Sequence, residues 1–567
     1  MKRIGTAVVA VACLTALTLA APSPASSAPP AEAGLQPLLD QTLVVDGITR
    51  QYAVYVPSQQ PIYRVADPKD NPIVVILHPD GETAHEYALR TQWSRVAEEE
   101  GFIAAFPSAQ NGTWNTHLDP GRPDDIGFVT AVTDAVRGAY QGSSVNVYIV
   151  GEGTGAAVAN EVAAINSPKY VAVASLTGGA PADFYQTASN RLRRTTMASW
   201  TFVNGRLTGD EHRQIEYWKH ANKVDPRPRH EHGRDFSTAI YRNPHNPLAQ
   251  VRVSYLRGPS ALGGTSVARA VWRDMFHPTL RFTDQDSVNG HLVPFQTAKQ
   301  MRLTEHTATL AGQTRRWLVY LPTRYRQLTN HGRKLPLVLA FHGRNGSGRY
   351  MAQQTGWHQV GEARGFIVVY PQAEPATGPN IGFSGSIDTA NPDVAFTLEL
   401  LADLTARFAV DSTRIIVTGV SQGAAFTNRL AVQYPHLFAA IAPCYSGHLN
   451  AASYSDPIVR TDVPLPVWQC RGVNEVPTDY PGGTAGEAAA RVFWRETVNK
   501  NTAPPTIEVD GRYTTDIYRD GAAEYRWTVN GDIGHFWPKN MGFKLWDDFL
   551  THYRRLPNGS LVRTHGP

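Results

Sequence analysis

The chain contains a long internal duplication, which constrains its fold more than any other feature. Segments of the first half correspond to segments of the second half in the same order: VDGITRQYAVYVP (45–57) to LAGQTRRWLVYLP (310–322), GFIAAFP (101–107) to GFIVVYP (365–371), NVYIVGEGTGAAVANEVA (146–163) to RIIVTGVSQGAAFTNRLA (414–431), and VWRDMF (271–276) to LWDDFL (545–550). A repeat of this length is a whole domain rather than a solenoid unit. The duplication therefore predicts two domains of one fold, at about 38–283 and 300–556.

Each copy alternates short apolar runs with segments of helical spacing. VVIL, FIAAF and NVYIV are continuous apolar runs, as expected for strands that are buried on both faces. DIGFVTAVTDAVRGAY and DVAFTLELLADLTARF have helical spacing, with Asp near the start. This alternation predicts an α/β fold in which helices flank a mostly parallel sheet. The join at 284–300 lacks a long Gly/Ser or Pro tract, so we expect the two domains to pack against each other.

The first residues, 1–33, predict a secretory signal peptide and a processed tail. Lys2 and Arg3 precede an apolar stretch from Ile4 to Ala21, and a Pro-rich tract of small residues follows. This layout is typical of a secretory signal and predicts a secreted, extracellular protein. Cleavage near Ala21 and cleavage at the tripeptide AEA (31–33) both fit. An uncleaved membrane anchor is the alternative, but the apolar run is barely long enough to span a bilayer.

Charge and cysteine content narrow the possible partners. The formal net charge is +4 over 567 residues, without a dense Lys/Arg run, so nothing favours nucleic-acid binding. Cys13 lies in the signal segment, whereas Cys444 and Cys470 fall near the ends of predicted neighbouring strands. A disulfide and two buried thiols both fit this placement. No cysteine has the spacing of a metal site, and we expect neither a metal nor another cofactor.

The strongest catalytic signal is the motif Gly-Val-Ser-Gln-Gly at 419–423, which follows the apolar run RIIVT and opens a helical pattern. G-x-S-x-G in this setting predicts a nucleophile elbow, because the strand-to-helix turn is too tight for larger side chains beside the serine. Ser421 is the predicted nucleophile. The backbone N–H of Gln422, at the helix N-terminus, is a predicted oxyanion donor.

A serine nucleophile needs a general base and an acid that orients it. His535 lies in GDIGHFWPKN, after a strand pattern, and this late position fits the order serine, acid, histidine of α/β-hydrolases. Glu475, in the loop RGVNEVPTDY after PVWQC, is the predicted acid, and Asp479 is the alternative. Asp462 precedes the strand and is less favoured.

The second oxyanion donor should come from the loop after the run LVLAF. The backbone N–H of Arg344 is the predicted donor, with Gly343 as the alternative, and His342 is expected to hold the loop. Three further side chains are candidates for the substrate pocket: Trp537, Trp357 and His358. For Trp357, packing in the core is the favoured role.

These motifs also carry a family resemblance. The second domain resembles secreted polyhydroxybutyrate depolymerase-like esterases, which are related to feruloyl and acetylxylan esterases of carbohydrate esterase family 1. The matching segments run through nearly the whole domain: RRWLVYLP, LVLAFHG, GFIVVYP, DSTRIIVTGVSQGAAFTNRLA, PVWQCRGVNEVP and GHFWP. The family pattern H-G-x-x-D places Glu475 at the acid and Arg471 at the preceding histidine, and G-H-x-W-P places His535 at the base.

The first domain resembles the same family without its chemistry. The nucleophile position falls on Gly153, the acid position on Thr208, and the histidine position near Leu262. Thr154 lies one residue from the elbow tip and is not expected to replace the serine. His291, in NGHLVPF, lies beyond the last helix of the domain and is assigned to the interdomain connection. We therefore expect a degenerate, non-catalytic domain.

Together these features predict a secreted serine carboxylic-ester hydrolase that acts through an acyl-enzyme. The resemblance implies an ester substrate: a polyhydroxyalkanoate-type polyester or its oligomers, or alternatively a feruloyl or acetyl ester on plant polysaccharide. The sequence also leaves other classes open, namely a serine peptidase or acyltransferase with the same triad, or a non-catalytic binding protein. No nucleic-acid partner is expected, and no membrane partner after signal cleavage.

Overall fold

The computed structural model describes residues 35–58, 71–116, 119–140, 142–258, 262–282, 290–344, 346–373, 379–381, 390–445, 447–476, 478 and 482–564. The predicted signal segment, 1–33, and the alternative acid Asp479 therefore lie outside the described residues. No helix in these ranges is long and apolar enough to cross a membrane.

The first half of the chain forms a ten-stranded sheet in the order β1-β2-β4-β3-β5-β6-β7-β10-β9-β8. Neighbouring strands from β4 to β10 are parallel, and the outer pairs are antiparallel. The strands are β1 Leu39–Val45, β2 Ile48–Tyr55, β3 Asn71–Leu77, β4 Ile103–Pro107, β5 Gly142–Glu152, β6 Ala172–Leu176, β7 Ala198–Val203, β8 Arg229–His232, β9 Phe236–Arg242 and β10 Gln250–Leu256.

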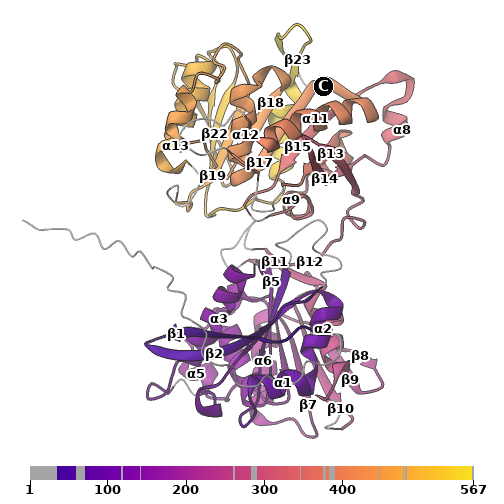
Figure 1. Cartoon of the computed structure of the whole chain (residues 1–567), viewed down its shortest axis with the longest axis vertical. Helices are drawn as coiled ribbons and strands as arrows, with labels where there is room; N and C mark the ends of the chain where they lie inside the picture. The colour runs from indigo at the N-terminus through magenta and orange to yellow at the C-terminus, as the bar shows by residue number, and fades with distance from the viewer. Residues whose placement is uncertain are drawn as a thin grey trace, which may run out of the picture.

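Helices cover both faces of this sheet (Figure 1). They are α1 Ala84–Thr91, α2 Trp93–Glu100, α3 Asp125–Ala139, α4 Thr154–Ile165, α5 Phe184–Thr187, α6 Gly209–Asn222 and α7 Thr265–Val271. Alternate residues of β3 enter different cores: Ile73 and Val75 pack on one side, and Val74 and Ile76 on the other. This two-sided burial explains why the central strands are continuous apolar runs rather than alternating patterns.

The second half of the chain repeats this architecture. Its ten strands have the order β13-β14-β16-β15-β17-β18-β19-β22-β21-β20, which matches the first sheet position by position. The strands are β13 Thr304–Leu310, β14 Gln313–Tyr320, β15 Leu335–Phe341, β16 Ile367–Pro371, β17 Val410–Val420, β18 Ala440–Cys444, β19 Val467–Gly472, β20 Thr506–Asp510, β21 Tyr513–Tyr518 and β22 Tyr525–Asn530. The predicted α/β fold class, with two sheets of one design, is confirmed.

The helices of the second half are α8 Tyr325–Leu328, α9 Gly348–Thr355, α10 Trp357–Arg364, α11 Pro392–Arg407, α12 Gln422–Gln433, α13 Gly483–Val492 and α14 Met541–Asp548. The two segments predicted to be helical, α3 and α11, are capped by side chains. Asp124 accepts a hydrogen bond from the N–H of Gly127, and Asn391 accepts from Asp393 and Val394, which satisfies N–H groups that have no partner within the helix.

A small antiparallel hairpin follows each large sheet. Strands β11 (Thr279–Phe282) and β12 (His291–Pro294) form the first hairpin, and β23 (Tyr553–Arg555) and β24 (Leu561–Arg563) form the second. Figure 1 shows β11 and β12 between the two domains. β12 thus lies beyond residue 283, the predicted end of the first domain, and pairs with β11 inside it.

Candidate active site

Ser421 lies in a strand-to-helix turn between β17 and α12, with backbone angles φ 57° and ψ −121°. A left-handed φ is unfavourable for a non-glycine residue and is typical of a strained nucleophile elbow. The flanking glycines are sterically required. A Cβ on Gly419 would lie 2.3 Å from the backbone of Gly423, and a Cβ on Gly423 would lie 2.2 Å from the Phe341 carbonyl oxygen.

The register of four parallel strands brings the predicted catalytic loops to one edge of the sheet. Val420 pairs with Cys444, Cys444 with Cys470, and Cys470 with Thr528. Ser421 follows the first of these strands directly, and the loops with Glu475 and His535 follow the third and fourth. The carboxyl ends of parallel strands are where α/β proteins assemble their active sites.

The side chains of Glu475 and His535 are in contact at this edge of the sheet. His535 Nδ1 lies 2.9 Å from Glu475 Oε1, and the Glu475 side chain is fully buried whereas 23% of the His535 side chain is exposed. The two loops are joined by a backbone hydrogen bond from Asn474 N–H to the Ile533 carbonyl oxygen (2.9 Å). A buried carboxylate on Nδ1 fixes the tautomer that leaves Nε2 as the base. Asp462 instead forms an exposed ion pair with Arg460.

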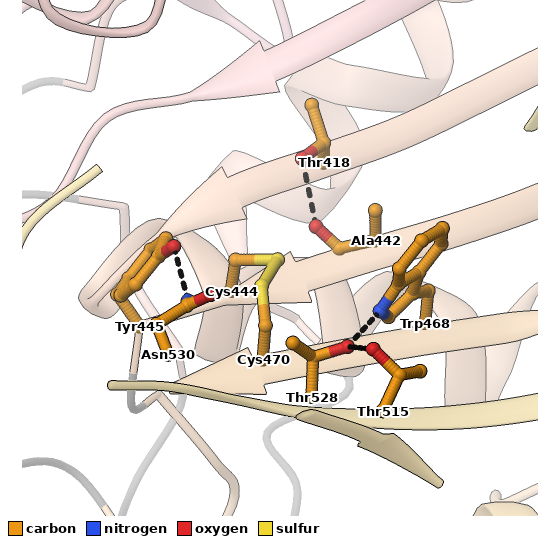
Figure 2. Close-up of a disulfide and its surroundings, with 9 residues drawn as sticks. All are labelled: Thr418, Ala442, Cys444, Tyr445, Trp468, Cys470, Thr515, Thr528 and Asn530. Atoms are coloured by element: carbon orange, nitrogen blue, oxygen red, sulfur yellow. Dashed lines mark hydrogen bonds between the residues drawn. A yellow bond between two sulfur atoms is a disulfide. The ribbon is translucent and has the colours of Figure 1, made fainter. Parts of the chain in front are cut away.

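The elbow is anchored to the next strand through its own amide. Ser421 N–H lies 3.3 Å from the Cys444 carbonyl oxygen and 3.2 Å from that of Tyr445. The Tyr445 hydroxyl in turn accepts a hydrogen bond from Asn530 Nδ2 at 2.6 Å, at the end of β22 (Figure 2). Tyr445 therefore links the nucleophile turn to the strand that precedes the His535 loop.

Cys444 and Cys470 form a disulfide, which decides between the two alternatives left open by the sequence. Figure 2 shows the bond joining the adjacent strands β18 and β19. Their Cα atoms are 4.7 Å apart. The two cysteines are paired in the register of these strands, at the same edge of the sheet as the elbow of Ser421.

The loop after β15 supplies the second predicted oxyanion donor. A Cβ on Gly343 would lie 3.2 Å from Ser421 Cβ, so this loop passes directly against the nucleophile. Within the described residues, the backbone N–H groups of Arg344 and Gln422 have no acceptor. His342 is buried and holds the loop, since its Nε2 accepts from Ala373 N–H at 3.1 Å.

The three pocket candidates are buried in the core instead of lining an open cavity. Trp357 and Trp537 are 0% and 1% exposed and their ring centroids are 6.1 Å apart. His358 is 7% exposed, and burial lowers its pKa to about 4. This burial agrees with the core role favoured for Trp357, and it gives no support to a pocket role for Trp537 and His358. Trp537 follows His535 by two residues but points inward, where it packs against Tyr445.

The first domain has the same turn between strand and helix, with different residues in and around it. Gly153 takes the place of the serine, with φ 57° and ψ −122°. A Cβ on Gly153 would lie only 3.2 Å from Pro79 Cβ. The N–H of Asp80, which corresponds to the oxyanion donor of the second domain, donates to the Thr154 hydroxyl at 2.9 Å. A side chain at this position would thus be crowded by Pro79, and one donor is already bonded.

The acid and histidine positions predicted in the first domain fall on leucines, with one shift of position. The buried tryptophans Trp200 and Trp468 make the same hydrogen bond to the neighbouring strand. If these two tryptophans are equivalent, Leu207 is the residue equivalent to Glu475. It lies one residue before the predicted position, Thr208, which is the N-cap of α6. Leu262 is buried in the core, and His291 begins β12 of the interdomain hairpin.

A second polar cluster lies beside the candidate acid and was missed by the sequence analysis. Arg471 NH1 is 3.4 Å from Glu487 Oε1, and His448 Nε2 is 3.9 Å from Glu487 Oε2. Burial, together with Arg471 and Arg491, lowers the pKa of His448 to about 3, so this histidine is neutral near pH 7. No local motif marks the cluster, because its members come from three separate segments.

The described residues contain no group of three or more His, Cys, Asp or Glu side chains arranged to hold a metal ion. Comparison with known families gives one match: residues 319–464 fit the family described as "Esterase PHB depolymerase", where PHB is polyhydroxybutyrate. This part of the chain matches the PHB depolymerase esterase family. The family is one of carboxylic ester hydrolases, and the match ends before the Glu475 and His535 loops.

Several known esterases and depolymerases are similar to part of this chain. Poly(3-hydroxyalkanoate) depolymerase C of Paucimonas lemoignei is 32% identical over 123 residues, covering 21% of this chain and 29% of the relative. The bifunctional acetylxylan esterase/xylanase XynS20E of Neocallimastix patriciarum is 26% identical over 145 residues, covering 26% and 20%. Feruloyl esterase B of Talaromyces stipitatus is 24% identical over 268 residues, covering 40% and 70%.

The chain thus spans less than a third of the first two of these relatives. Among solved structures, the acetyl xylan esterase from Aspergillus awamori aligns with a TM-score of 0.35 at 19% identity, covering 43% of this chain and 98% of that structure. The assignment of the PHB depolymerase esterase domain therefore rests on the family match and on the strand order and elbow described above.

Proposed function

We propose that the protein is a serine carboxylic-ester hydrolase whose active site lies in the second domain. The observation that carries the proposal is the 2.9 Å contact between His535 Nδ1 and Glu475 Oε1 at the sheet edge where Ser421 forms an elbow. The three residues follow strands that end at this edge, and they come in the chain order nucleophile, acid and base. That combination supports acyl transfer more than any other reaction.

The proposed reaction uses the side chains of the triad and two backbone N–H groups. Ser421 Oγ attacks the ester carbonyl carbon while His535 accepts its proton, and buried Glu475 stabilises the imidazolium. The N–H groups of Gln422 and Arg344 bind the developing oxyanion. His535 then protonates the departing alcohol, and a water molecule activated by the same histidine releases the acid from Ser421.

The proposed substrate is a polyhydroxyalkanoate-type polyester or its oligomers, with a feruloyl or acetyl ester on plant polysaccharide as the alternative. The names of the relatives support both classes. Two valines beside the candidate acid, Val473 and Val476, are 48% and 53% exposed. They give this side of the site an apolar surface, which favours an aliphatic polyester because burying exposed apolar area against the substrate is favourable.

Two further parts of the proposal concern the first domain and the location of the protein. The first domain is non-catalytic, since Gly153 stands in place of the serine, a Cβ there would be crowded by Pro79, and the Asp80 N–H is already bonded to the Thr154 hydroxyl. The protein is secreted. The signal-like segment at 1–33 supports this, as does the Cys444–Cys470 disulfide, because such bonds persist in oxidising compartments.

The test compares the full chain with its Ser421→Ala variant on p-nitrophenyl acetate, polyhydroxybutyrate, feruloylated and acetylated xylan, and a peptide substrate. We expect the variant to lose at least a thousandfold in kcat with its fold intact. Preferred release of hydroxy acids would support the polyester assignment. Equal turnover by both proteins would refute Ser421, and cleavage of the peptide alone would point to a peptidase.

A further inference from the structure

The β11–β12 hairpin is fixed to the first domain by buried polar contacts. The Tyr148 hydroxyl donates to the Thr279 carbonyl oxygen at 2.7 Å. The Arg281 guanidinium donates to the carbonyl oxygens of Tyr170 at 2.8 Å and Thr196 at 2.5 Å. These partners precede or belong to central strands of the first sheet. The hairpin therefore moves with the first domain rather than acting as a flexible linker.

Phe295, directly after β12, lies between the two domains. Its ring centroid is 5.0 Å from the His277 ring of the first domain, and the Arg349 guanidinium carbon of α9 lies 4.8 Å from the same centroid. Arg349 is 7% exposed and also donates to the Gln296 carbonyl oxygen at 3.0 Å. Gln353, one turn further along α9, donates to the Pro294 carbonyl oxygen at 2.7 Å.

Helix α9 is the direct continuation of the loop that carries the proposed oxyanion donor. Ser347 caps the helix by accepting the N–H of Tyr350 at 2.9 Å. The Tyr350 ring meets Phe282 of β11 with centroids 5.6 Å apart. Gly346 N–H, just before the cap, bonds to the Gly343 carbonyl oxygen at 3.1 Å. A short chain of contacts thus joins the hairpin to the loop residue beside Ser421.

The corresponding helix of the first domain, α1, is closed by its own residues. Thr83 and Glu86 form a reciprocal capping box at its start. In α9 the same positions hold Ser347 and Tyr350, so the second half of the box, the acidic side chain that reaches back to the cap, is missing. The residue in its place contacts the hairpin instead. The start of α9 therefore depends on the other domain where α1 does not.

We infer that the first domain positions the oxyanion loop of the second domain. Phe282 and Phe295 act as positioning residues, because their rings contact Tyr350 and Arg349 of α9. The inference rests on the proposed function, because it assigns a catalytic consequence to the loop at Gly343 and Arg344. A donor that is displaced by a fraction of an ångström from the developing oxyanion loses most of its effect. Loss of the contact should therefore lower kcat more than it raises KM.

The experiment compares the full chain with its Phe295→Ala and Phe282→Ala variants on p-nitrophenyl acetate and on the corresponding thionoester, in which sulfur replaces the carbonyl oxygen. We expect kcat for the ester to fall about tenfold with KM within twofold. The ester-to-thionoester rate ratio should fall as well, because a loosened oxyanion site discriminates less between oxygen and sulfur. Phe295→Tyr, which keeps the ring over Arg349, should retain both values.

Two further variants keep the result interpretable. Gln353→Ala removes the hydrogen bonds of this side chain to Pro294 and Gln296, together with one from Arg349 within α9. It should lower kcat about threefold, so it decides the question if Phe295→Ala does not fold. Val562→Ala, on the corresponding hairpin of the second domain, should change neither value. Unchanged kcat and rate ratio in folded Phe295→Ala, even with a lower melting temperature, would overturn the inference alone. A wild-type chain without any turnover would overturn the proposed function and the inference with it.

Discussion

Gly153 and Ser421 adopt the same backbone conformation, φ 57° with ψ −122° and −121°, at the same point of two sheets with the same strand order. The first domain has therefore kept the geometry of a nucleophile elbow without the nucleophile. What separates the two sites is the side chains that surround the turn, and this difference can be tested directly.

Restoring the serine alone should not restore a site in the first domain. In a Ser421→Ala background, we expect Gly153→Ser to show no ester hydrolysis above that of the background. The added Cβ meets Pro79 at 3.2 Å, and the Asp80 N–H is already bonded to Thr154. Turnover of p-nitrophenyl acetate is the measurement, with circular dichroism to verify folding. Activity that appears with this single change would show that the first domain lacks only the serine.

Glu475→Gln should lower kcat by about a thousandfold or more with little change in KM. The amide cannot stabilise the imidazolium that forms when His535 accepts the serine proton. Glu475→Asp should be milder, since the charge is kept and only the reach is shortened. Asp479→Asn is the matched comparison, and it should retain wild-type kcat. A larger loss in Asp479→Asn than in Glu475→Gln would transfer the role of the acid to Asp479.

Glu161→Gln should stabilise the first domain near neutral pH. Glu161 is 0% exposed, and its carboxylate oxygens have no hydrogen-bond partner within the described part of the chain. Burial, with smaller effects of Asp125 and Asp183, raises the pKa of this carboxyl well above its usual range. The folded protein thus holds a proton that the unfolded chain releases, and stability is lost as pH rises above the unfolded pKa.

Each unit by which this pKa is raised contributes about 1.4 kcal/mol to the loss. The measurement is calorimetric unfolding of wild type and Glu161→Gln between pH 4 and pH 8. The gain of the variant should be small at pH 4 and should grow towards pH 8. A gain that is the same at both ends of the range would show that Glu161 does not titrate on unfolding.

Loss of the disulfide should destabilise the second domain. The cysteines are separated by 26 positions. Closing a loop of about this length lowers the entropy of the unfolded chain, which raises the free energy of unfolding by about 3 kcal/mol. Denaturant unfolding of the double variant Cys444→Ala and Cys470→Ala measures the effect. A reducing agent should destabilise wild type by a similar amount and leave the variant unchanged. A reductant effect of equal size on both proteins would argue against the bond.

The sequence predicted the parts of the site that depend on local turns and on strand order. The elbow at Ser421 follows from two glycines and a serine, and Glu475 follows from its position after PVWQC. The burial of Trp537 and His358 was not predictable, because a residue beside a catalytic loop points into the core or the cleft according to the packing of distant helices. The contact of Phe295 with Arg349 joins segments whose proximity no local pattern indicates.

The duplication also doubled the number of open sheet edges, since within the described parts of the chain each ten-stranded sheet ends in two strands with one neighbour each. Such edges expose unpaired backbone groups and can pair with another molecule. Every one of the four edge strands carries charge: Asp40 on β1, Glu231 on β8, Glu305 on β13 and Glu508 on β20. On β20, Glu508 lies between Ile507 and Val509, which are 64% and 69% exposed. These carboxylates oppose edge-to-edge aggregation, and neutralising them in acid would remove that protection.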